Sequence, residues 1–164
     1  MIKGWEYKTL SEAVEKQSSN LTLNKASNNF GPYVVFGAKG IVGSISTYDQ
    51  EREYIGIIKD GAGVGRVYQF PARTSVLATM QYLVPKHGQD ISFIKYFLNS
   101  LNFDDFKTGS TIPHIYFKDY KHVPYPILSV QEQKRIVAIL DEAFEGIARA
   151  EANAEKNLAN AREL

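Results

Sequence analysis

Apolar residues in the first 128 positions come in short runs that glycine-rich or polar stretches separate. Four runs are rich in β-branched and aromatic residues and predict strands over 33–36, 54–58, 65–70 and 80–84. Apolar residues on one helical face predict a helix over 92–101. The remaining segments predict a short amphipathic start over 9–15, a polar, turn-prone stretch over 20–33, and a short closing strand with Phe117, Val123, Tyr125 and Ile127. The pattern therefore predicts a β-rich globular part with short helices.

The pattern changes at residue 129, where a helical period replaces the short runs. Ser129 and Glu132 have the spacing of a capping box, and Pro124 and Pro126 keep the preceding chain extended. Small or apolar positions then recur at steps of four and three, which predicts one long helix over 129–164 with a coiled-coil-type seam. The seam runs to Leu164 through Ile136, Leu140, Ala143, Ile147, Ala150, Ala154, Asn157 and Ala161.

This helix carries two stripes that predict two different contacts. Val137, Phe144 and Ala148 widen the apolar face near the helix start, and we expect them to pack on the globular part. The distal seam is mostly alanine, which buries little area, and an isolated helix of this kind is marginally stable. We therefore expect the seam to pair with another helix. The alternative is a solvated, alanine-rich helix without a partner.

Charge divides along the chain in the same way as the apolar pattern. The 164 residues hold 19 Lys and Arg against 18 Asp and Glu, a net charge of +1, which argues mildly against a strongly basic nucleic-acid binder. Residues 1–128, however, hold 14 basic and 11 acidic side chains, whereas residues 129–164 hold 5 and 7. The chain has no cysteine, which excludes disulfides and cysteine zinc sites. No run has the length of a signal peptide core or a membrane span, so we expect a cytoplasmic protein without a membrane segment.

Two glycine clusters, at 36–43 and 59–66, are candidates for binding loops. Neither opens a helix and neither has the Gly-Lys-Ser/Thr ending of a phosphate-binding loop, so a nucleotide site is not predicted. Glycine at positive φ in tight β-turns accounts for both clusters. Such turns could also present the flanking Lys39, Ser44, Lys59 and Arg66 to a partner.

The sequence offers no candidate catalytic or metal-binding set. It lacks a Gly-x-Ser-x-Gly elbow, a cysteine nucleophile and a His-Glu-x-x-His pair, and the histidines at 87, 114 and 122 do not have metal-ligand spacing. Asp104 and Asp105 are typical of a solvated loop. The stretch 107–115 is a polar loop with a proline stop, which either contacts phosphate through Ser110 and Thr111 or serves only as a turn.

The ordered set of these segments resembles the specificity (S) subunit of type I restriction-modification systems, and the resemblance covers nearly the whole chain. It rests on Gly4-Trp5-Glu6 through Leu10, Tyr33-x-x-Phe36-Gly37, Gly40-Ile41-Val42-Gly43, Ile57-x-Lys59-x-Gly61-x-x-x-Gly65-x-Val67-Tyr68, Gly109-Ser110-Thr111-Ile112-Pro113, Pro124-Tyr125-Pro126-Ile127-Leu128, Gln131-Glu132-Gln133-Lys134-Arg135-Ile136-Val137, and Asn160-Ala161-Arg162-Glu163-Leu164. The most specific of these is the stretch that leads from Pro124 into Val137.

The resemblance implies an α+β fold with a β-rich target recognition domain over 1–128 and a spacer and dimerisation helix over 129–164. It implies a non-catalytic subunit that reads one half of a bipartite double-stranded DNA target. Its partners would be methyltransferase (M) subunits, which bind S-adenosylmethionine and methylate adenine, and restriction (R) subunits, which use ATP; any Mg²⁺ would also lie on those partners. The typical subunit has two recognition domains and two helical regions. This chain would have one recognition domain and one helical region, which implies either a fragment or a half-length subunit that pairs with itself or with another half.

Within the recognition domain, base and phosphate contacts need hydrogen-bonding side chains on exposed loops. The candidate DNA-binding residues are Lys39, Ser44, Ser46, Lys59, Arg66, Arg73, Thr79, Gln81, Lys107, Thr108 and Ser110. Two other functions remain open at this point. One is a β-rich module that binds protein or carbohydrate and uses the helix to oligomerise; the other is the specificity fragment of a fused restriction-methyltransferase.

Overall fold

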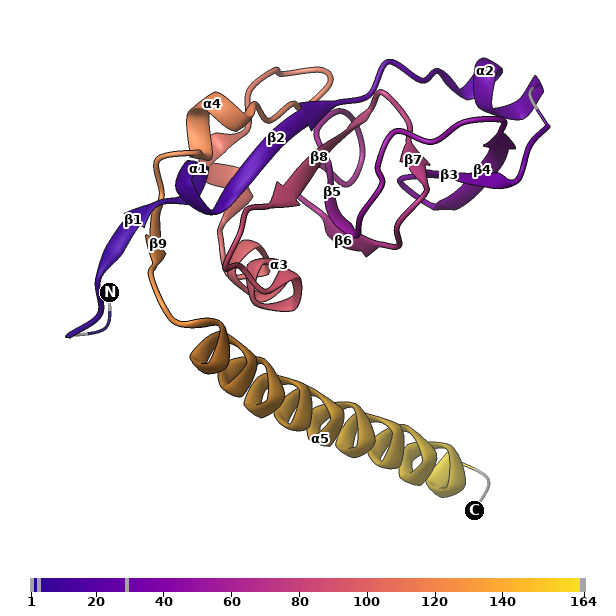
Figure 1. Ribbon diagram of the computed structural model, residues 1–164. Helices are drawn as coiled ribbons and strands as arrows, with labels where there is room; N and C mark the ends of the chain where they lie inside the picture. The colour runs from indigo at the N-terminus through magenta and orange to yellow at the C-terminus, as the bar shows by residue number, and fades with distance from the viewer. Residues whose placement is uncertain (1, 3, 29, 163–164) are drawn as a thin grey trace.

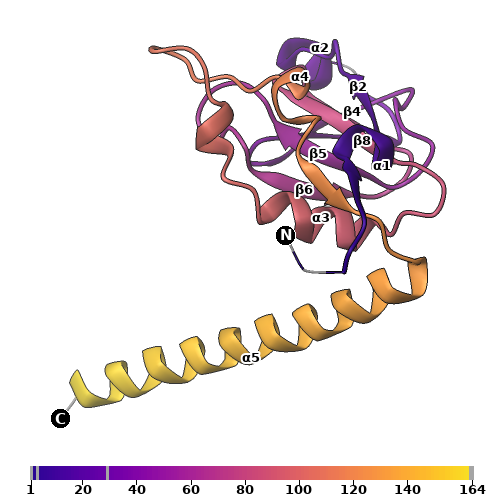
Figure 2. The same ribbon diagram turned by 90° about the vertical axis from the view of Figure 1, so that its left-hand side faces the viewer.

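The computed structural model describes residues 2, 4–28 and 30–162, which form a mixed α+β body followed by one long helix (Figure 1). The body contains β1 (Tyr7–Thr9), α1 (Leu10–Ala13), β2 (Val14–Ser18), α2 (Leu23–Asn28), β3 (Tyr33–Gly37), β4 (Gly40–Ile45), β5 (Tyr54–Ile58), β6 (Val67–Phe70), β7 (Ser75–Val76), β8 (Met80–Pro85), α3 (Ile91–Asn99), the 3-10 helix η1 (Phe103–Phe106), α4 (Phe117–Tyr120) and β9 (Pro124–Pro126). Helix α5 (Val130–Arg162) follows. In Figures 1 and 2, α5 runs below α3 and extends past the body.

Three small sheets make up the body. The largest has the strand order β2-β8-β5-β6 and is antiparallel throughout. The second has the order β4-β3-β7, in which β3 and β7 are parallel. The third pairs β1 with β9, so that Thr9 lies opposite Pro124. This last pairing joins the two ends of the body immediately before α5 begins.

The main core lies between the four-stranded sheet, α3 and the segment that leads to α5. All five residues of β5 are buried, and its Ile55 and Ile57 face the same cluster as Leu98 of α3. Tyr125 of β9 is fully buried there and meets the ring of Phe97 edge-on, with 4.8 Å between the ring centroids. Apolar burial on this scale is the main favourable contribution to folding, and it anchors the chain close to the start of the long helix.

The apolar runs predicted the buried elements correctly. Strands β3, β5, β6 and β8 and helix α3 confirm the predicted elements, as do the long helix and the α+β fold class. The glycine cluster at 36–43 forms the predicted tight turn, since Gly37 pairs with Gly40 in the β3–β4 hairpin and Gly40 has a φ of +117°. Ser129 Oγ accepts a hydrogen bond from the Glu132 N–H (3.2 Å), so this half of the predicted cap is formed.

Three segments differ from the prediction. Residues 20–33 contain α2, residues 9–15 divide into α1 and the start of β2, and Phe117 lies in α4, which leaves only Pro124–Pro126 as the closing strand. Helix α2 is six residues long and owes its position to a close approach: a Cβ on Gly43 would lie 2.3 Å from the Ala26 carbonyl oxygen. Such long-range packing leaves no periodic pattern in the sequence.

Gly56 provides a direct test of the packing in the central sheet. A Cβ at this position would lie 2.4 Å from Phe70 Cε2, and the Phe70 ring is itself stacked on Phe36 (4.5 Å between centroids). We expect Gly56→Ala to lower the free energy of unfolding by about 1–3 kcal/mol, because the buried ring must shift. Urea denaturation measures this loss.

Gly146→Ala is the matched control, since a Cβ on Gly146 meets no atom within 4 Å in the middle of α5. Alanine there should favour the helix by about 0.5–1 kcal/mol. A Gly56→Ala protein with the wild-type urea midpoint would contradict the packing described for β5 and Phe70.

Candidate nucleic-acid interface

Four lysines surround a hollow of about 360 Å³ on one face of the body. Lys16 comes from β2, Lys59 follows β5, and Lys118 and Lys121 come from α4 and the residue after it. The apolar wall consists of Ile115, Tyr116 and Phe117, and Gln81 of β8 lies at its base. The hollow therefore combines positive charge with aromatic surface.

Backbone hydrogen bonds hold the Lys59 side of this hollow in place. The Lys59 N–H donates to the Thr79 carbonyl (2.9 Å), and the Lys59 carbonyl accepts from the Ile115 N–H (3.0 Å). Gln81 is buried, and its side-chain amide donates to the hydroxyl of Tyr120. Burial raises the pKa of the Tyr120 hydroxyl, which therefore stays protonated. The side-chain amide of Gln81, a lining residue of the hollow, is therefore already paired with Tyr120.

The loop 107–115 forms a finger beside the hollow. Thr108 and His114 exchange two backbone hydrogen bonds (2.9 and 2.8 Å), and His114 Nδ1 lies 3.0 Å from Asp60 Oδ1. The Gly61 N–H also donates to the Pro113 carbonyl (3.0 Å), so the base of the finger is fastened to the glycine-rich turn after β5. Figure 2 shows the finger projecting from the body. Ser110 is exposed and lies between the paired residues Thr108 and His114.

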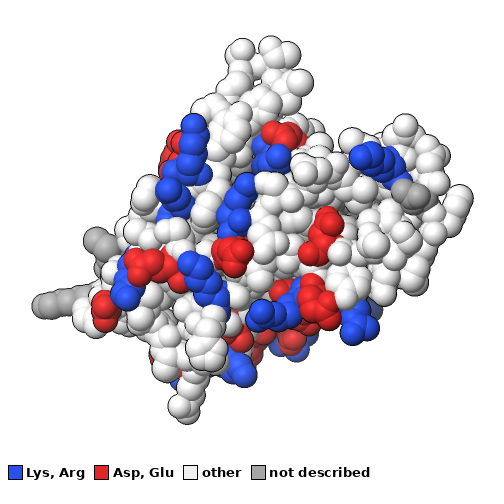
Figure 3. All heavy atoms as spheres, turned by 45° about the horizontal axis from the view of Figure 1, so that its top comes forward, with Lys and Arg blue, Asp and Glu red and all other residues white. Residues whose placement is uncertain are grey.

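A second hollow of about 440 Å³ adjoins the first, since Tyr116 and Lys118 line both. Its other lining residues include Lys107, whose ammonium pairs with Asp104, and Thr108. The Tyr116 side chain is 47% exposed, and Lys118 Nζ lies 5.3 Å from its ring centroid. An exposed ring among lysines is suited to stacking and phosphate contacts. Figure 3 looks onto this face, where lysines gather over β2 and α4.

Five of the predicted DNA-binding residues therefore belong to one surface. Lys59 and Gln81 line the first hollow, and Lys107 and Thr108 line the second. Ser110 lies on the finger beside them. Thr79 joins them through its carbonyl, which accepts hydrogen bonds from the backbone N–H groups of residues 59 and 60. Gln81 differs from the others because its amide is buried and already paired with Tyr120.

The other predicted residues lie elsewhere. Lys39 is in the turn between β3 and β4, and Ser44 lines a separate hollow beside α2 that includes Phe30. Ser46 follows β4, and Arg66 precedes β6 in the glycine-rich turn. Arg73, at a positive φ of 58°, lies 3.8 Å from the Glu51 carboxylate. The fold does not bring these five into the lysine-lined hollows.

Lys16, Tyr116, Lys118 and Lys121 were missed as candidates. The signal for three of them is visible in the sequence, because basic and aromatic side chains are interspersed over residues 114–122. Lys16 has no such signal: it lies on the edge strand β2 and reaches the hollow only because β2 pairs with β8.

Helix α5 presents one stripe to the body and leaves another uncovered. Val137 packs against the main core, and the Phe144 ring stacks on Tyr96 of α3 with 5.7 Å between centroids, which confirms the predicted contact with the globular part. Ala148 lines the groove at this contact. Of the seam, Ile136 also packs on the core and Leu140 is half-buried. The remaining seam positions within the described helix are exposed, namely Ala143, Ile147, Ala150, Ala154, Asn157 and Ala161.

Two further properties concern only the residues that the structure describes. Among them, no three His, Asp or Glu side chains gather in a way that could hold a metal ion. Within the same residues, no helix combines the length and the apolar character that crossing a membrane requires.

A family model for the type I restriction modification DNA specificity domain matches residues 2–158. The chain belongs to this family. The resemblance predicted from the ordered motifs is thereby confirmed. No curated protein is similar enough in sequence to count as a match.

Solved structures similar to this specificity domain come from the same kind of system. One, from work on the complex assembly and conformational transition of the type I R-M system, is 22% identical with a TM-score of 0.75, over 98% of this chain and 44% of that one. The type I S subunit from M. genitalium is 19% identical (TM-score 0.66), over 91% and 42%. The HsdS subunit from Thermoanaerobacter tengcongensis is 20% identical (TM-score 0.69), over 91% and 39%. This chain spans less than half the length of each.

Proposed function

We propose that this chain is a DNA-recognition subunit of a type I restriction-modification complex and reads one half of a bipartite target. The observation that carries the proposal is the surface formed by Lys16, Lys59, Lys118, Lys121 and Tyr116 in a chain of the specificity-domain family. Lysines supply the salt-dependent phosphate contacts that dominate affinity for DNA. Hydrogen-bonding side chains on the neighbouring finger, such as Thr108 and Ser110, are suited to base edges.

The proposal divides the chain between two tasks. Residues 1–128 form the target recognition domain, and residues 129–164 form a spacer and pairing helix that joins the domain to a second copy or a second half. The chemistry then resides on partner subunits: the M subunit binds S-adenosylmethionine and methylates adenine, and the R subunit uses ATP and Mg²⁺. The chain contributes recognition and docking, and we expect the complex to act in the cytoplasm.

Co-expression with the methyltransferase subunit from the same organism tests this function. We expect the two proteins to purify together and to methylate adenine in a DNA motif of two short sequences separated by a fixed, unspecified spacer. Sequencing that detects methylated adenine across a host genome identifies the motif. The same methyltransferase subunit expressed without this chain is the control. A folded pair that does not associate, or that methylates without sequence preference, would contradict the proposal.

A further inference from the structure

The junction between the body and α5 contains a buried amide. Gln133, in the first turn of α5, is fully buried, although most of this helix is exposed. Its Nε2 group donates to the Leu128 carbonyl (2.9 Å) and to the Gly88 carbonyl (3.2 Å), and its Oε1 accepts from the Asp90 N–H (2.8 Å). One side chain thus joins α5 to the β8–α3 loop and to the chain before the helix.

The amide of Gln133 is itself buried, while the three backbone groups that it pairs with lie in a partly buried junction. A displacement of α5 would leave this buried donor and acceptor without partners, at the cost of their desolvation, so the observed arrangement is favoured over displaced ones. Hydrogen bonds are also directional, whereas apolar contact is not. The amide therefore fixes both the rotation of α5 about its axis and its position along that axis.

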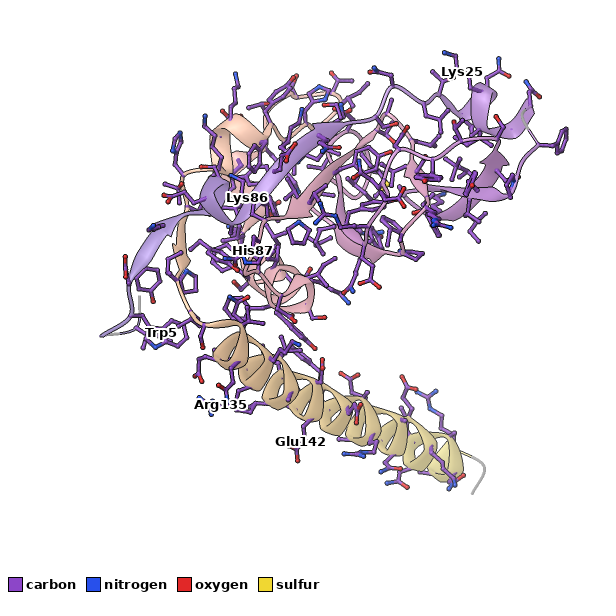
Figure 4. The ribbon with its side chains drawn as sticks, viewed as in Figure 1. Trp5, Lys25, Lys86, His87, Arg135 and Glu142 are labelled. Atoms are coloured by element: carbon purple, nitrogen blue, oxygen red, sulfur yellow. The ribbon has the colours of Figure 1, made fainter. Side chains whose placement is uncertain are left out.

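A second contact holds α5 about two to three turns further along. The Tyr96 hydroxyl donates to the Asp141 carboxylate, and its ring lies at 5° to the plane of the Phe144 ring. Between the two contacts, Ile136 and Val137 pack on the main core. Figure 4 shows the start of α5 close to His87 of the β8–α3 loop, with Arg135 on the side that points away. Beyond Ala148, the described helix extends without contact to its own body.

Because α5 is long, a small tilt at its start moves its far end by a distance comparable to the rise of one base pair. From Gln133 to Arg162 the helix is about 45 Å long at 1.5 Å per residue. A tilt of about 5° at Gln133 would move the far end by about 4 Å, close to the 3.4 Å rise of one base pair. The direction of α5 must be held to within a few degrees for a spacer of fixed length to be read.

We propose that Gln133 is a positioning residue that sets the direction of α5 on the recognition body, and thereby the spacer length accepted between the two half-sites. This rests on the proposed function as one half of a bipartite reader. Gln133 contacts no DNA in the proposed arrangement. Its role is to hold the pairing helix in one orientation, with Tyr96 as a weaker second support.

The decisive comparison is between Gln133→Ala and Gln131→Ala, each in complex with the methyltransferase subunit. Gln131 is an exposed glutamine two residues earlier on the same helix and serves as the matched control. We expect both variants to methylate the same two half-site sequences as the wild type. In Gln133→Ala, the preference for the wild-type spacer over spacers one base pair longer or shorter should fall at least about tenfold. Unchanged spacer preference in a folded Gln133→Ala complex would overturn the proposal.

A second measurement examines the helix direction without any DNA. The chain has no cysteine, so Asn99→Cys on α3 and Ala152→Cys on the distal part of α5 create two unique spin-label sites. Diluted into excess unlabelled protein, the pair should give a narrow distance distribution that broadens with Gln133→Ala and stays narrow with Gln131→Ala. Gln133→Asn keeps the amide but shortens the side chain. It replaces the alanine variant in this measurement if that variant does not fold, and it should broaden the distribution in the same way. Equal widths in all folded variants would overturn the proposal.

The two measurements separate this inference from the function on which it rests. If the wild-type complex methylates no bipartite motif, the proposed function fails, whereas the label distances still report on Gln133. If the wild type reads a fixed spacer and Gln133→Ala reads it with the same selectivity, only the role of Gln133 is overturned.

Discussion

Replacement of Lys59, Lys118 and Lys121 by alanine should weaken binding of the assembled complex to its DNA target by about 100- to 1,000-fold at physiological salt. The loss should be similar for cognate and non-cognate DNA, because phosphate contacts carry no sequence information. The slope of log affinity against log salt concentration should become shallower by about 1 for each lysine removed. Fluorescence anisotropy at several salt concentrations measures both quantities.

Lys59 is available for phosphate despite its ion pair. Lys59 Nζ lies 3.6 Å from Asp60, and both side chains are about one-third exposed or less. Asp60 also faces His114, so its carboxylate keeps a partner when Lys59 turns to a phosphate. Ion pairs open to solvent contribute little free energy, so the exchange of Asp60 for a phosphate costs little.

A matched variant removes the same charge from another part of the molecule. Lys134, Arg149 and Lys156 all lie exposed on α5, outside the lysine-lined hollows, and their replacement by alanine should leave the salt slope nearly unchanged. If the two triple variants lose affinity equally, net charge accounts for the effect and the face beside α4 is not the DNA site. If the variant without Lys59, Lys118 and Lys121 loses its preference for the half-site sequence but keeps the wild-type salt slope, these lysines read bases.

The buried parts of the fold could be predicted from the sequence because burial imposes a pattern. Strand β5 is buried at every position and appears in the sequence as a continuous apolar run. Strand β2 buries only Val14 among five residues, because it is an edge strand, and its polar sequence predicts no strand. Short elements such as α2 and α4 depend on contacts with distant residues, which a single sequence does not reveal.

The candidate DNA-binding surface, too, could be predicted from the sequence only in part. Lys59 and Lys107 were predicted because each lies in a loop with a recognisable sequence of glycine or proline turns. The position of Lys16 beside them depends on the register of β2 and β8, in which Lys16 lies opposite Leu83. That register follows from the pairing of all five β2 residues with β8, from Val14 opposite Pro85 to Ser18 opposite Gln81, and no local motif encodes it. Prediction from loops therefore found part of the surface and also residues, such as Arg73, that lie away from it.

Glutamate at Ala143, Ala150 and Ala154 should abolish pairing through α5 while the body stays folded. These three positions lie on the exposed seam, and a paired helix would bury each carboxylate against apolar or like-charged surface. Because several carboxylates would be buried per pair, we expect the dissociation constant of the pair to rise by at least about three orders of magnitude. The variant would then be monomeric at micromolar concentration. Sedimentation velocity measures the association, and circular dichroism checks that the helix and the sheets remain.

The same helix offers a closely matched control. Ala138, Ala152 and Ala159 are exposed and fall on the opposite side of α5 at about 100° per residue, so their replacement by glutamate adds equal charge away from the seam. This control should sediment as the wild type does. If the Ala143, Ala150 and Ala154 variant assembles as the wild type does, or if the wild type is a monomer, the seam is not a pairing surface.

The consequence for recognition follows from symmetry. Two copies that pair through one self-complementary seam are related by a two-fold axis, so their recognition domains read inverted copies of one half-site. The seam variant should therefore lose methylation of the bipartite target while each body keeps its lysine face and its weak affinity for single half-sites. A wild-type motif with two different halves would instead require a second, distinct recognition domain on the other side of the helix pair.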